Sequence, residues 1–418
     1  MPVEQAVTCG WFPAGMKDAE IAAGMGELRA LCRAAGAVVV GEAWQRRPAP
    51  DRRTLVGQGK VEELRQMIAA RGAGLAVFHN VLTTLQQRNL EDALAVKVID
   101  RSRLILDIFA TRARSQEGKL QVELAQLLYL LPRLTGKGVG LSRLGGGIGT
   151  RGPGETKLES DRRQIRDKIA RIRQKLKGVT RNRDLQRRNR RELPVPLVAL
   201  VGYTSSGKST LFKALTNEEV FISPELFATL DPLLRRVDLH DSHPGYYFIL
   251  SDTVGFIRDM PAELFTSFTA TLEEVRQADL LLHVIDWTHP DWTGQKSEVD
   301  KVLRQLGVDP SRVIPVFNKI DLCRDRERPG AGGGDGRVFI SAVEGTGLAE
   351  LKQEIFRRYF SDYAAFTVDV EDEQQLDALG RWAIVLEKSR VNGRFRAAVL
   401  CSREKMLQFR ETHGGVIR

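Results

Sequence analysis

The chain has 418 residues, of which 42% are hydrophobic and 28% charged, and its formal net charge at pH 7 is +10. The length allows roughly three domains, and the lack of any run of about 18 apolar residues argues against a transmembrane helix. Four isolated cysteines argue against a zinc site and a disulfide framework, and the first residues lack a secretory pattern. We therefore expect a cytoplasmic, monomeric protein.

The first segment, which we place at residues 1–115, alternates short apolar runs with helical patterns. Strands are expected at Ala37–Val40, Leu75–Phe78 and Val96–Asp100, and helices at Lys60–Ala70 and Thr83–Leu94. This alternation predicts a small parallel sheet with helices packed on its faces. We find no catalytic constellation in it.

The second segment, residues 116–192, has the pattern of two long helices. Leucines recur at helical spacing between Lys119 and Leu134, and a second apolar stripe follows at Leu158, Ile165, Ile169, Ile172 and Leu176. Two amphipathic helices so close in sequence should pack antiparallel on each other. Burial of the two stripes explains them without any functional role.

The second of these helices is strongly basic. Only Asp167 and Asp184 oppose the lysines and arginines at positions 162, 163, 166, 168, 171, 173, 175, 177, 181, 183, 187, 188, 190 and 191. An ordinary run of charge is a solvated helix face, but so large an excess favours a polyanion, either nucleic acid or an acidic membrane surface. We favour nucleic acid.

A glycine-rich stretch, Arg143–Asp161, separates the two helices. Its six glycines make a helix costly, and it is longer than a plain hairpin requires. Glycine backbone can approach phosphates or bases closely, and Arg143 and Arg151 can add phosphate contacts. We interpret the stretch as a functional loop rather than a flexible connection.

From about Leu193 the chain repeats strands and helices. Strands are expected at Val195–Leu200, Tyr246–Asp252, Leu280–Asp286, Val313–Asn318 and Val338–Ser341. This order predicts an α/β fold with a doubly wound, mostly parallel sheet over residues 193–362. Residues 363–418 predict a small α+β element, with a helix at Glu373–Leu386 and a strand at Phe395–Leu400.

The third segment begins with a phosphate-binding motif. Gly202-Tyr203-Thr204-Ser205-Ser206-Gly207-Lys208-Ser209 matches G-x-x-x-x-G-K-[ST] between an apolar strand and a helix expected at Ser209–Leu215. Backbone N–H groups and the helix N-terminus bind phosphate in this motif. We expect Lys208 to reach the β- and γ-phosphates and Ser209 to ligate Mg²⁺, with Thr210 beside it in the site.

Asp252-Thr253-Val254-Gly255 follows a second strand. Asp252 is expected to hold Mg²⁺, and the Gly255 amide to contact the γ-phosphate. Alone this signal is weak, because any strand can end in Asp, but its position after the phosphate loop strengthens it.

Asn318-Lys319-Ile320-Asp321 follows a third strand, at the end of the sheet where ligands bind. The Asp321 carboxylate can accept hydrogen bonds from guanine N1–H and the exocyclic amine, which adenine cannot offer. A buried acceptor left unpaired costs roughly 1–3 kcal/mol, which selects GTP over ATP. Ser341-Ala342 would supply a backbone N–H for the guanine O6. These motifs predict a GTP-binding and GTP-hydrolysing enzyme.

The motifs GYTSSGKSTLF, LFATLDP, DTVGFI and NKID resemble the GTPase domain of the HflX family of ribosome-associated G proteins. GQGKVEEL, the stretch from Val98 to Leu134 and GGGIGTRGPGETKLESDRR resemble that family's N-terminal domain. The resemblance covers roughly residues 25–360 and is most specific around RGPGET. It implies a P-loop G domain preceded by a small α/β subdomain and a long antiparallel helical hairpin.

The resemblance also implies a partner and further site residues. The large ribosomal subunit and its RNA would be bound through the loop Arg143–Glu155 and the helix Arg162–Arg191, to split or rescue stalled ribosomes. Phe227, Ala228 and Thr229 would form a switch at the nucleotide. Catalysis would then rest on Lys208, Thr229 and Gly255, and Mg²⁺ on Ser209, Thr229 and Asp252.

Three positions depart from expectation. Ser205-Ser206 replaces the family's usual Asn-Ala, whose asparagine can help relatives to hold a stimulating potassium ion, which puts that stimulation in doubt here. Leu233 and Leu234 replace polar residues after LDP and can alter packing of the switch. Phe256 stands where Ras-like proteins carry a catalytic Gln, as is normal for the family, so intrinsic turnover should be slow until ribosome docking orders the switches.

Two other readings stay open. The chain could be an RNA-binding assembly factor that uses GTP as an ordering ligand with little turnover. It could also be a peripheral GTPase with weak membrane association through its basic helix, although the apolar stripe lacks the Trp and Phe of an interfacial helix.

Overall fold

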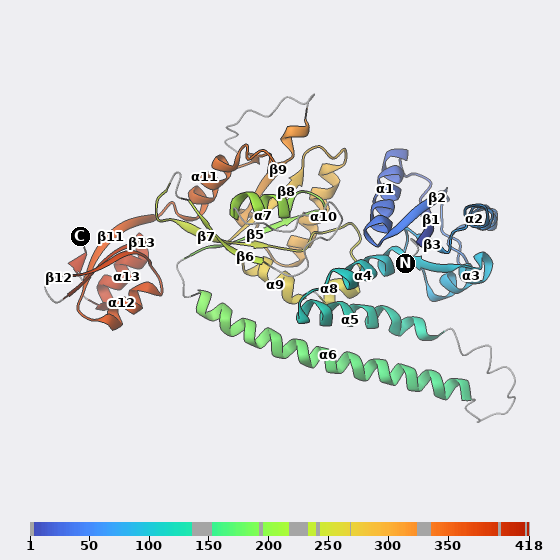
Figure 1. Ribbon diagram of the computed structural model, residues 1–418, viewed down its shortest axis with the longest axis horizontal. Coiled ribbons are helices and arrows are strands. Elements are labelled where there is room, and N and C mark those ends of the chain that lie inside the picture. Colours follow the sequence, from blue (N-terminus) through green and yellow to red (C-terminus); the bar gives the residue numbers. More distant parts are fainter. Residues whose placement is uncertain are drawn as a thin grey trace. The chain divides into compact units, whose positions relative to one another are not determined.

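The computed structural model describes residues 4–135, 153–191, 195–216, 233–239, 243–267, 269–323, 336–391, 394–413 and 416–417 (Figure 1). Two compact units are present. We call the described residues up to Lys177, together with Asp259–Thr269, the N-terminal unit, and the remaining described residues the second unit. No described helix has both the length and the apolar character to cross a bilayer. The predicted loop Arg143–Glu155 and the switch residues Phe227, Ala228 and Thr229 lie outside what the structure describes, apart from the backbone of the loop's last residues.

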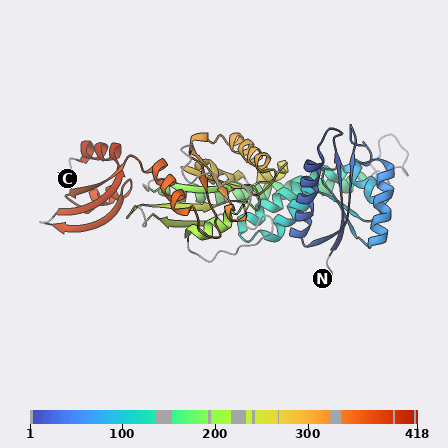
Figure 2. The same cartoon turned by 90° about the horizontal axis from the view of Figure 1, so that it is seen from above.

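A parallel four-stranded sheet with strand order β2-β1-β3-β4 forms the centre of the N-terminal unit. Its elements are β1 (Glu4–Phe12), α1 (Asp18–Ala34), β2 (Ala37–Arg46), α2 (Gln58–Arg71), β3 (Leu75–Phe78), α3 (Thr84–Leu94) and β4 (Lys97–Asp100). Helices α2 and α3 bury one face through Leu64, Ile68 and Leu90, whereas α1 packs beside α4 (Figure 2). The predicted parallel sheet is confirmed, but its central strand β1 and helix α1 were missed.

Two helices follow the sheet, α4 (Arg101–Arg112) and α5 (Gln116–Leu130), and α5 continues as a 3-10 turn over Leu131–Thr135. Side-chain caps start both helices, because Asp100 accepts from the Arg103 N–H at 2.8 Å and Ser115 from the Gly118 N–H at 2.9 Å. The predicted leucine helix corresponds to α5, and α4 was not predicted separately.

The basic helix is α6 (Pro153–Arg191). Its apolar residues Ile169 and Ile172 are buried against Leu124 of α5, with Ile165 and Leu176 packed around them. The two predicted apolar stripes therefore meet, as expected, and between residues 159 and 179 the lysine and arginine side chains of α6 lie on the other sides of the helix.

The second unit contains a six-stranded sheet with order β10-β9-β8-β5-β7-β6, parallel except for β6. Its elements are β5 (Leu197–Gly202), α7 (Lys208–Thr216), β6 (Leu233–Asp238), β7 (Tyr247–Asp252), α9 (Thr269–Gln277), β8 (Leu280–Asp286), α10 (Trp292–Gln305), β9 (Val313–Asn318), β10 (Val338–Phe339) and α11 (Leu348–Tyr359). Short 3-10 turns cover Pro310–Arg312 and Ile320–Leu322. The predicted doubly wound architecture is confirmed, with helices on both faces of the sheet.

Leu233 and Leu234, noted above for their departure from the family pattern, start the edge strand β6. Leu233 packs against the core of the sheet, a structural role that the sequence analysis did not anticipate.

The last element is a β-α-β-β-α-β arrangement with strand order β12-β13-β11-β14, all antiparallel. It consists of β11 (Tyr363–Val370), α12 (Glu373–Gly380), β12 (Ile384–Val391), β13 (Arg394–Ser402), α13 (Arg403–His413) and β14 (Val416–Ile417). Both helices lie on one side of the sheet (Figure 2). The predicted helix Glu373–Leu386 was too long, since α12 ends at Gly380 and Ile384 already belongs to β12.

One short segment of the third predicted domain belongs to the N-terminal unit. Helix α8 (Ala262–Ser267) packs against α5. The buried Arg101 guanidinium donates to the Asp259 carbonyl at 3.2 Å and pairs with Glu27 at 2.5 Å. The chain that leaves the Asp252–Gly255 motif therefore runs directly into contacts with α4 and α5.

Candidate nucleotide-binding site

The phosphate-binding motif forms the predicted loop between β5 and α7. The Thr204 N–H donates to the Phe256 carbonyl at 2.8 Å, and the Phe256 N–H donates to the Gly202 carbonyl at 3.0 Å. These two bonds tie the loop to the chain that follows Asp252-Thr253-Val254-Gly255. The Tyr203 hydroxyl adds a third link by accepting from the Arg258 N–H at 2.9 Å.

Gly207 shows why the motif needs a glycine next to its lysine. Its φ is +96°, which side chains rarely tolerate, and a Cβ there would collide with the Asn318 amide nitrogen. The loop backbone therefore passes directly against the guanine-recognition motif. Ser205 also has a positive φ, +61°, although it is exposed and is not glycine.

Lys208 is buried at the centre of the loop, 7% exposed. Its ammonium donates to the carbonyls of Gly202 at 3.0 Å and Tyr203 at 2.8 Å. Burial lowers the pKa of Lys208 to about 8, although the nearby Asp252 carboxylate acts in the opposite direction. A bound phosphate would supply the negative charge that this site lacks.

Two oxygen ligands suited to magnesium lie beside the lysine. The Ser209 hydroxyl, on the first turn of α7, donates to the Asp252 carboxylate at the end of β7, at 3.1 Å. Hydroxyl and carboxylate oxygens are hard donors that suit Mg²⁺, so the residues present fit the ion. Thr210 follows on the same turn of α7.

Gly255 lies against the lysine and the loop. A Cβ on this residue would be 3.0 Å from the Lys208 ammonium nitrogen and 3.0 Å from the Thr204 methyl carbon. A side chain there would compete with a phosphate for the same space. Just before it, Thr253 is fixed by a 2.5 Å hydrogen bond to the Leu200 carbonyl, and Val254 is buried.

The guanine-recognition motif begins at the end of β9 and is organised by Asn318. Its amide nitrogen donates to the Ser206 carbonyl at 2.9 Å, and its amide oxygen accepts from the Ala342 N–H at 3.0 Å. One side chain therefore joins the phosphate loop to the segment after β10. Ser341-Ala342 was predicted to supply a backbone N–H for the guanine O6, and of these two groups the Ala342 N–H is engaged by Asn318 in this structure.

Lys319 and Asp321 are the other polar residues of the guanine-recognition motif. The Lys319 ammonium pairs with Asp286 at 2.6 Å, which holds the lysine over the end of β8. Asp321 follows in a 3-10 turn, and Ser341 fixes the last loop by accepting from the Glu344 N–H at 3.1 Å. Asp286 was not predicted as a site residue. Its position as an acidic residue at the end of a buried strand could have indicated that it lies in the site.

The predicted motifs therefore converge. The phosphate loop, Asp252–Gly255, Asn318–Asp321 and Ser341–Ala342 all lie at the carboxyl ends of the parallel strands β5, β7, β9 and β10, where doubly wound sheets bind ligands. Phe227, Ala228 and Thr229 are outside the described residues.

The chain is similar to several known proteins. Three family models match in order, described as GTP-binding GTPase N-terminal (residues 22–110), GTP-binding GTPase middle region (residues 112–190) and 50S ribosome-binding GTPase (residues 197–319). Among solved structures, a similar chain is a GTP-binding protein from Sulfolobus solfataricus in complex with GDP, with a TM-score of 0.44, 22% identity and coverage of 86% of this chain and 99% of that chain.

Curated relatives carry the description GTPase HflX. The relative from Caldanaerobacter subterraneus is 47% identical over 87% of this chain and 84% of its own length. The relative from Escherichia coli is 42% identical over 89% of this chain and 86% of its own length.

Proposed function

The chain belongs to the HflX family of GTPases, and from this membership we propose that it binds the large ribosomal subunit and splits or rescues stalled ribosomes in a cycle of GTP binding and hydrolysis. Its cofactors are GTP or GDP and Mg²⁺. We place its action in the cytoplasm, as a monomer.

For the hydrolytic step we assign roles within residues 193–362. Lys208 would leave the carbonyls of Gly202 and Tyr203 to bind the β- and γ-phosphates, and the Gly255 amide would contact the γ-phosphate. Mg²⁺, held by Ser209, Asp252 and Thr229, would neutralise phosphate charge. Asp321 would select guanine, with Asn318 holding its motif against the phosphate loop.

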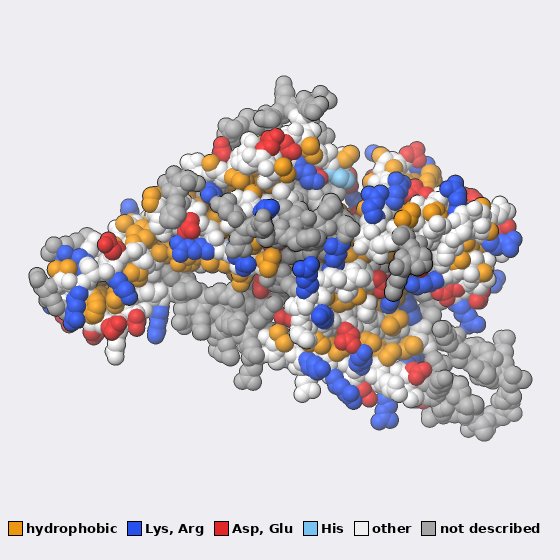
Figure 3. Space-filling model, in the orientation of Figure 1, with side chains coloured by type: hydrophobic (Ala, Val, Ile, Leu, Met, Phe, Trp, Pro, Cys, Tyr) orange, Lys and Arg blue, Asp and Glu red, His pale blue; other side chains and the backbone are white. Residues whose placement is uncertain are grey.

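For ribosome contact we assign residues 116–192, with residues 1–115 as a supporting domain and residues 363–418 as an accessory element. The observation that carries this assignment is the charge on α6. Between residues 159 and 177 its cations are Arg162, Arg163, Arg166, Lys168, Arg171, Arg173, Lys175 and Lys177, most of them exposed (Figure 3, lower edge). Lys168 pairs with Glu123 of α5 at 2.6 Å. Because Ile169 and Ile172 bury the apolar side of the helix, its basic side remains available for RNA phosphates.

The alternative is an assembly factor in which GTP orders the protein with little turnover. Phe256 is compatible with both functions. It is 2% exposed, and its apolar ring offers no group to orient the attacking water, so turnover without a partner should be slow in either case.

The decisive measurement is GTP turnover by the purified chain, alone and with large ribosomal subunits, with Lys208→Ala as the blank. Strong stimulation by the subunits supports the ribosome-triggered GTPase. GTP binding without stimulation supports the assembly factor instead.

A second experiment tests the assigned surface. Reversal of Arg166, Arg171 and Arg173 to Glu should abolish co-sedimentation with large subunits while leaving GDP binding intact. The matched control reverses Arg403, Lys405 and Arg410, which are exposed cations of α13. Equal loss of binding in both triple variants would contradict a specific role for α6.

A further inference from the structure

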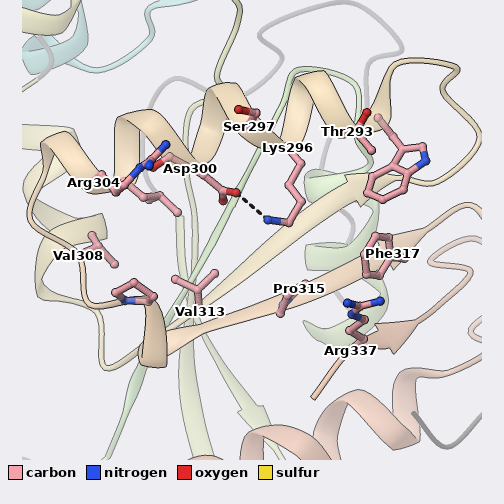
Figure 4. A pocket seen from close by; sticks show the side chains of 13 residues that line it. Thr293, Lys296, Ser297, Asp300, Arg304, Val308, Val313, Pro315, Phe317 and Arg337 are labelled. Atoms are coloured by element: carbon pink, nitrogen blue, oxygen red, sulfur yellow. Dashed lines mark hydrogen bonds and ion pairs between the residues drawn. The ribbon is translucent and has the colours of Figure 1, made fainter. Parts of the chain in front are cut away.

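A cavity of about 710 Å³ lies in the second unit between α10 and β9 (Figure 4). One wall is a face of α10 from Trp292 to Arg304, and the other is formed by Val313, Pro315 and Phe317, the alternate residues on one face of β9. None of the residues that we assign to the nucleotide lines it. The volume is in the range of small-molecule sites, roughly 300–1,000 Å³.

The cavity lies over the face of β9 that carries Val313, Pro315 and Phe317. The opposite face is covered, since Ile314 and Val316 pack in one core with Leu351 and Ile355 of α11. On the cavity side, the side chains of Val313 and Pro315 are only partly buried.

The floor of the cavity is apolar and partly aromatic. Phe317 contacts Trp292 with ring centroids 5.6 Å apart, nearly perpendicular. Phe317 also stacks on Phe339 at 4.8 Å, which fixes the orientation of its ring. Phe317 is itself buried, and it supports Trp292 from below the cavity surface. Trp292 and Pro315, both partly exposed, give this end of the cavity flat surfaces of the kind that bind an aromatic ring.

The rim of the cavity is cationic. Lys296, Arg304 and Arg337 line it against a single carboxylate, Asp300. Lys296 pairs with Asp300 at 2.6 Å, and Arg304 donates from Nε to the Asp300 carbonyl at 3.2 Å. Arg337 is exposed beside Phe317 in Figure 4, on the side of the cavity opposite α10. The positive excess at the aromatic end therefore suits an anionic group.

We propose that this cavity is a binding site for a small amphipathic anion, whose flat apolar body lies on Pro315 and Trp292 and whose acidic group pairs with Arg337. Two residues connect the site to the nucleotide. Phe317 immediately precedes Asn318 in β9. The ring of Trp287 packs on Trp292 with centroids 5.0 Å apart, and the backbone N–H of Trp287 donates to the Asn318 carbonyl at 3.1 Å. An occupant would therefore lie against the residues that support the guanine motif.

The test is a fluorescence titration of the full chain, loaded with GDP, with anilinonaphthalene sulfonate, a naphthalene ring system that carries one sulfonate. GDP fills the phosphate site, so the dye cannot report that site. The expected result is one saturable dye site per chain. Arg337→Glu should weaken it by at least about tenfold, because a charge-assisted contact is lost, and Ser297→Trp should block it by filling the cavity.

Matched controls separate this site from adventitious dye binding. Lys301→Glu makes the same change of charge, from positive to negative, on α10. Lys301 does not line the cavity and pairs with Glu298 instead. Dye affinity of this variant should therefore stay within about twofold of wild type. Phenylnaphthylamine, the same ring system without the sulfonate, should bind the wild type more weakly. Thermal unfolding and GDP affinity identify any variant that fails to fold, and Arg337→Ala and Thr293→Trp then replace it.

Four results would overturn the proposal. They are the absence of a saturable dye site, undiminished dye binding in folded Arg337→Glu, undiminished dye binding in folded Ser297→Trp, and equal affinity for the neutral and anionic dyes.

Discussion

The amide nitrogen of Asn318 donates a hydrogen bond to the backbone carbonyl of Ser206 at 2.9 Å. These residues are 112 positions apart in the chain, yet their bond joins the loop that holds phosphate to the motif that reads the base. Both side chains are almost fully buried, at 2% and 1% exposure. We therefore expect the binding of phosphate and the recognition of guanine to depend on the side chain of Asn318.

Replacing Asn318 with Ala should weaken GDP binding by roughly 10- to 100-fold, because the Ser206 carbonyl and the Ala342 N–H would both lose their buried partner. Calorimetric titration with GDP measures the effect. Asn89→Ala is the control, since the amide of Asn89 makes an exposed hydrogen bond to the Arg53 carbonyl at 2.9 Å in the N-terminal unit. GDP affinity within twofold of wild type in Asn318→Ala would refute the role of this bond.

The buried Lys208 predicts an unusual pH dependence for the nucleotide-free protein. Its pKa is lowered from 10.5 to about 8 by folding, so between these values the unfolded chain binds more protons than the folded chain. Stability contributed by this residue must therefore rise with pH from about 8 to 10.5. Thermal unfolding of the wild type and Lys208→Met across this window should show the wild type gaining relative to the variant.

GDP supplies the control for this prediction. The charge of the bound phosphates should restore the protonated form of Lys208, so the pH-dependent gain should disappear in saturating GDP. A constant difference between wild type and variant without nucleotide would mean that Lys208 keeps an ordinary pKa.

The strands that could be predicted from the sequence are short, mostly apolar runs. Leu280–Asp286 and Val313–Asn318 are runs of this kind, and their observed bounds equal the predicted ones. β1 was missed because Thr8, Cys9 and Gly10 interrupt its apolar pattern, although it is central and buried. The edge strand β6 was missed because half of it is charged. Helix α12 was extended too far because the reading continued the pattern past Gly380, where the helix ends.

The motifs of the site could likewise be predicted, because each has a local spacing that its chemistry requires. The contacts between the motifs, in contrast, could not be predicted from the sequence. The pairing of Lys319 with Asp286 and the contact of Gly207 with Asn318 join distant parts of the chain, and such pairs depend on strand order and register rather than on any local pattern.

Ser205 gives a prediction about ion dependence. Its φ of +61° places it in the left-handed region, where asparagine is tolerated better than serine. The family resemblance implies that asparagine at this position can help to hold potassium. Ser205→Asn should therefore fit the loop without strain and make GTP turnover faster in potassium than in sodium, whereas wild-type turnover should be equal in the two salts. Faster wild-type turnover in potassium would show that Ser205 does not remove the stimulation.

Asp100 gives a prediction about the stability of the N-terminal unit. Its side chain is fully buried at the end of β4, and its carboxylate accepts from the Leu82 N–H at 3.1 Å and the Tyr129 hydroxyl at 2.9 Å and pairs with Arg133 at 3.3 Å. Burial and this carboxylate together raise the pKa of Tyr129 well above its usual value. Asp100→Ala would leave Arg133, itself 15% exposed, without its counter-charge.

Removal of one partner of a buried ion pair costs about 3–5 kcal/mol, so Asp100→Ala should lower the free energy of unfolding of this unit by that amount in urea titrations. Asp92→Ala is the matched control, because Asp92 is exposed and lies 4.0 Å from Arg88, where a loss of about 0.5 kcal/mol or less is expected. The double variant Asp100→Ala with Arg133→Met should recover part of the loss, since no charge would then remain buried. If the double variant is as unstable as Asp100→Ala, the hydrogen bonds to Leu82 and Tyr129 carry the stability, and the ion pair does not.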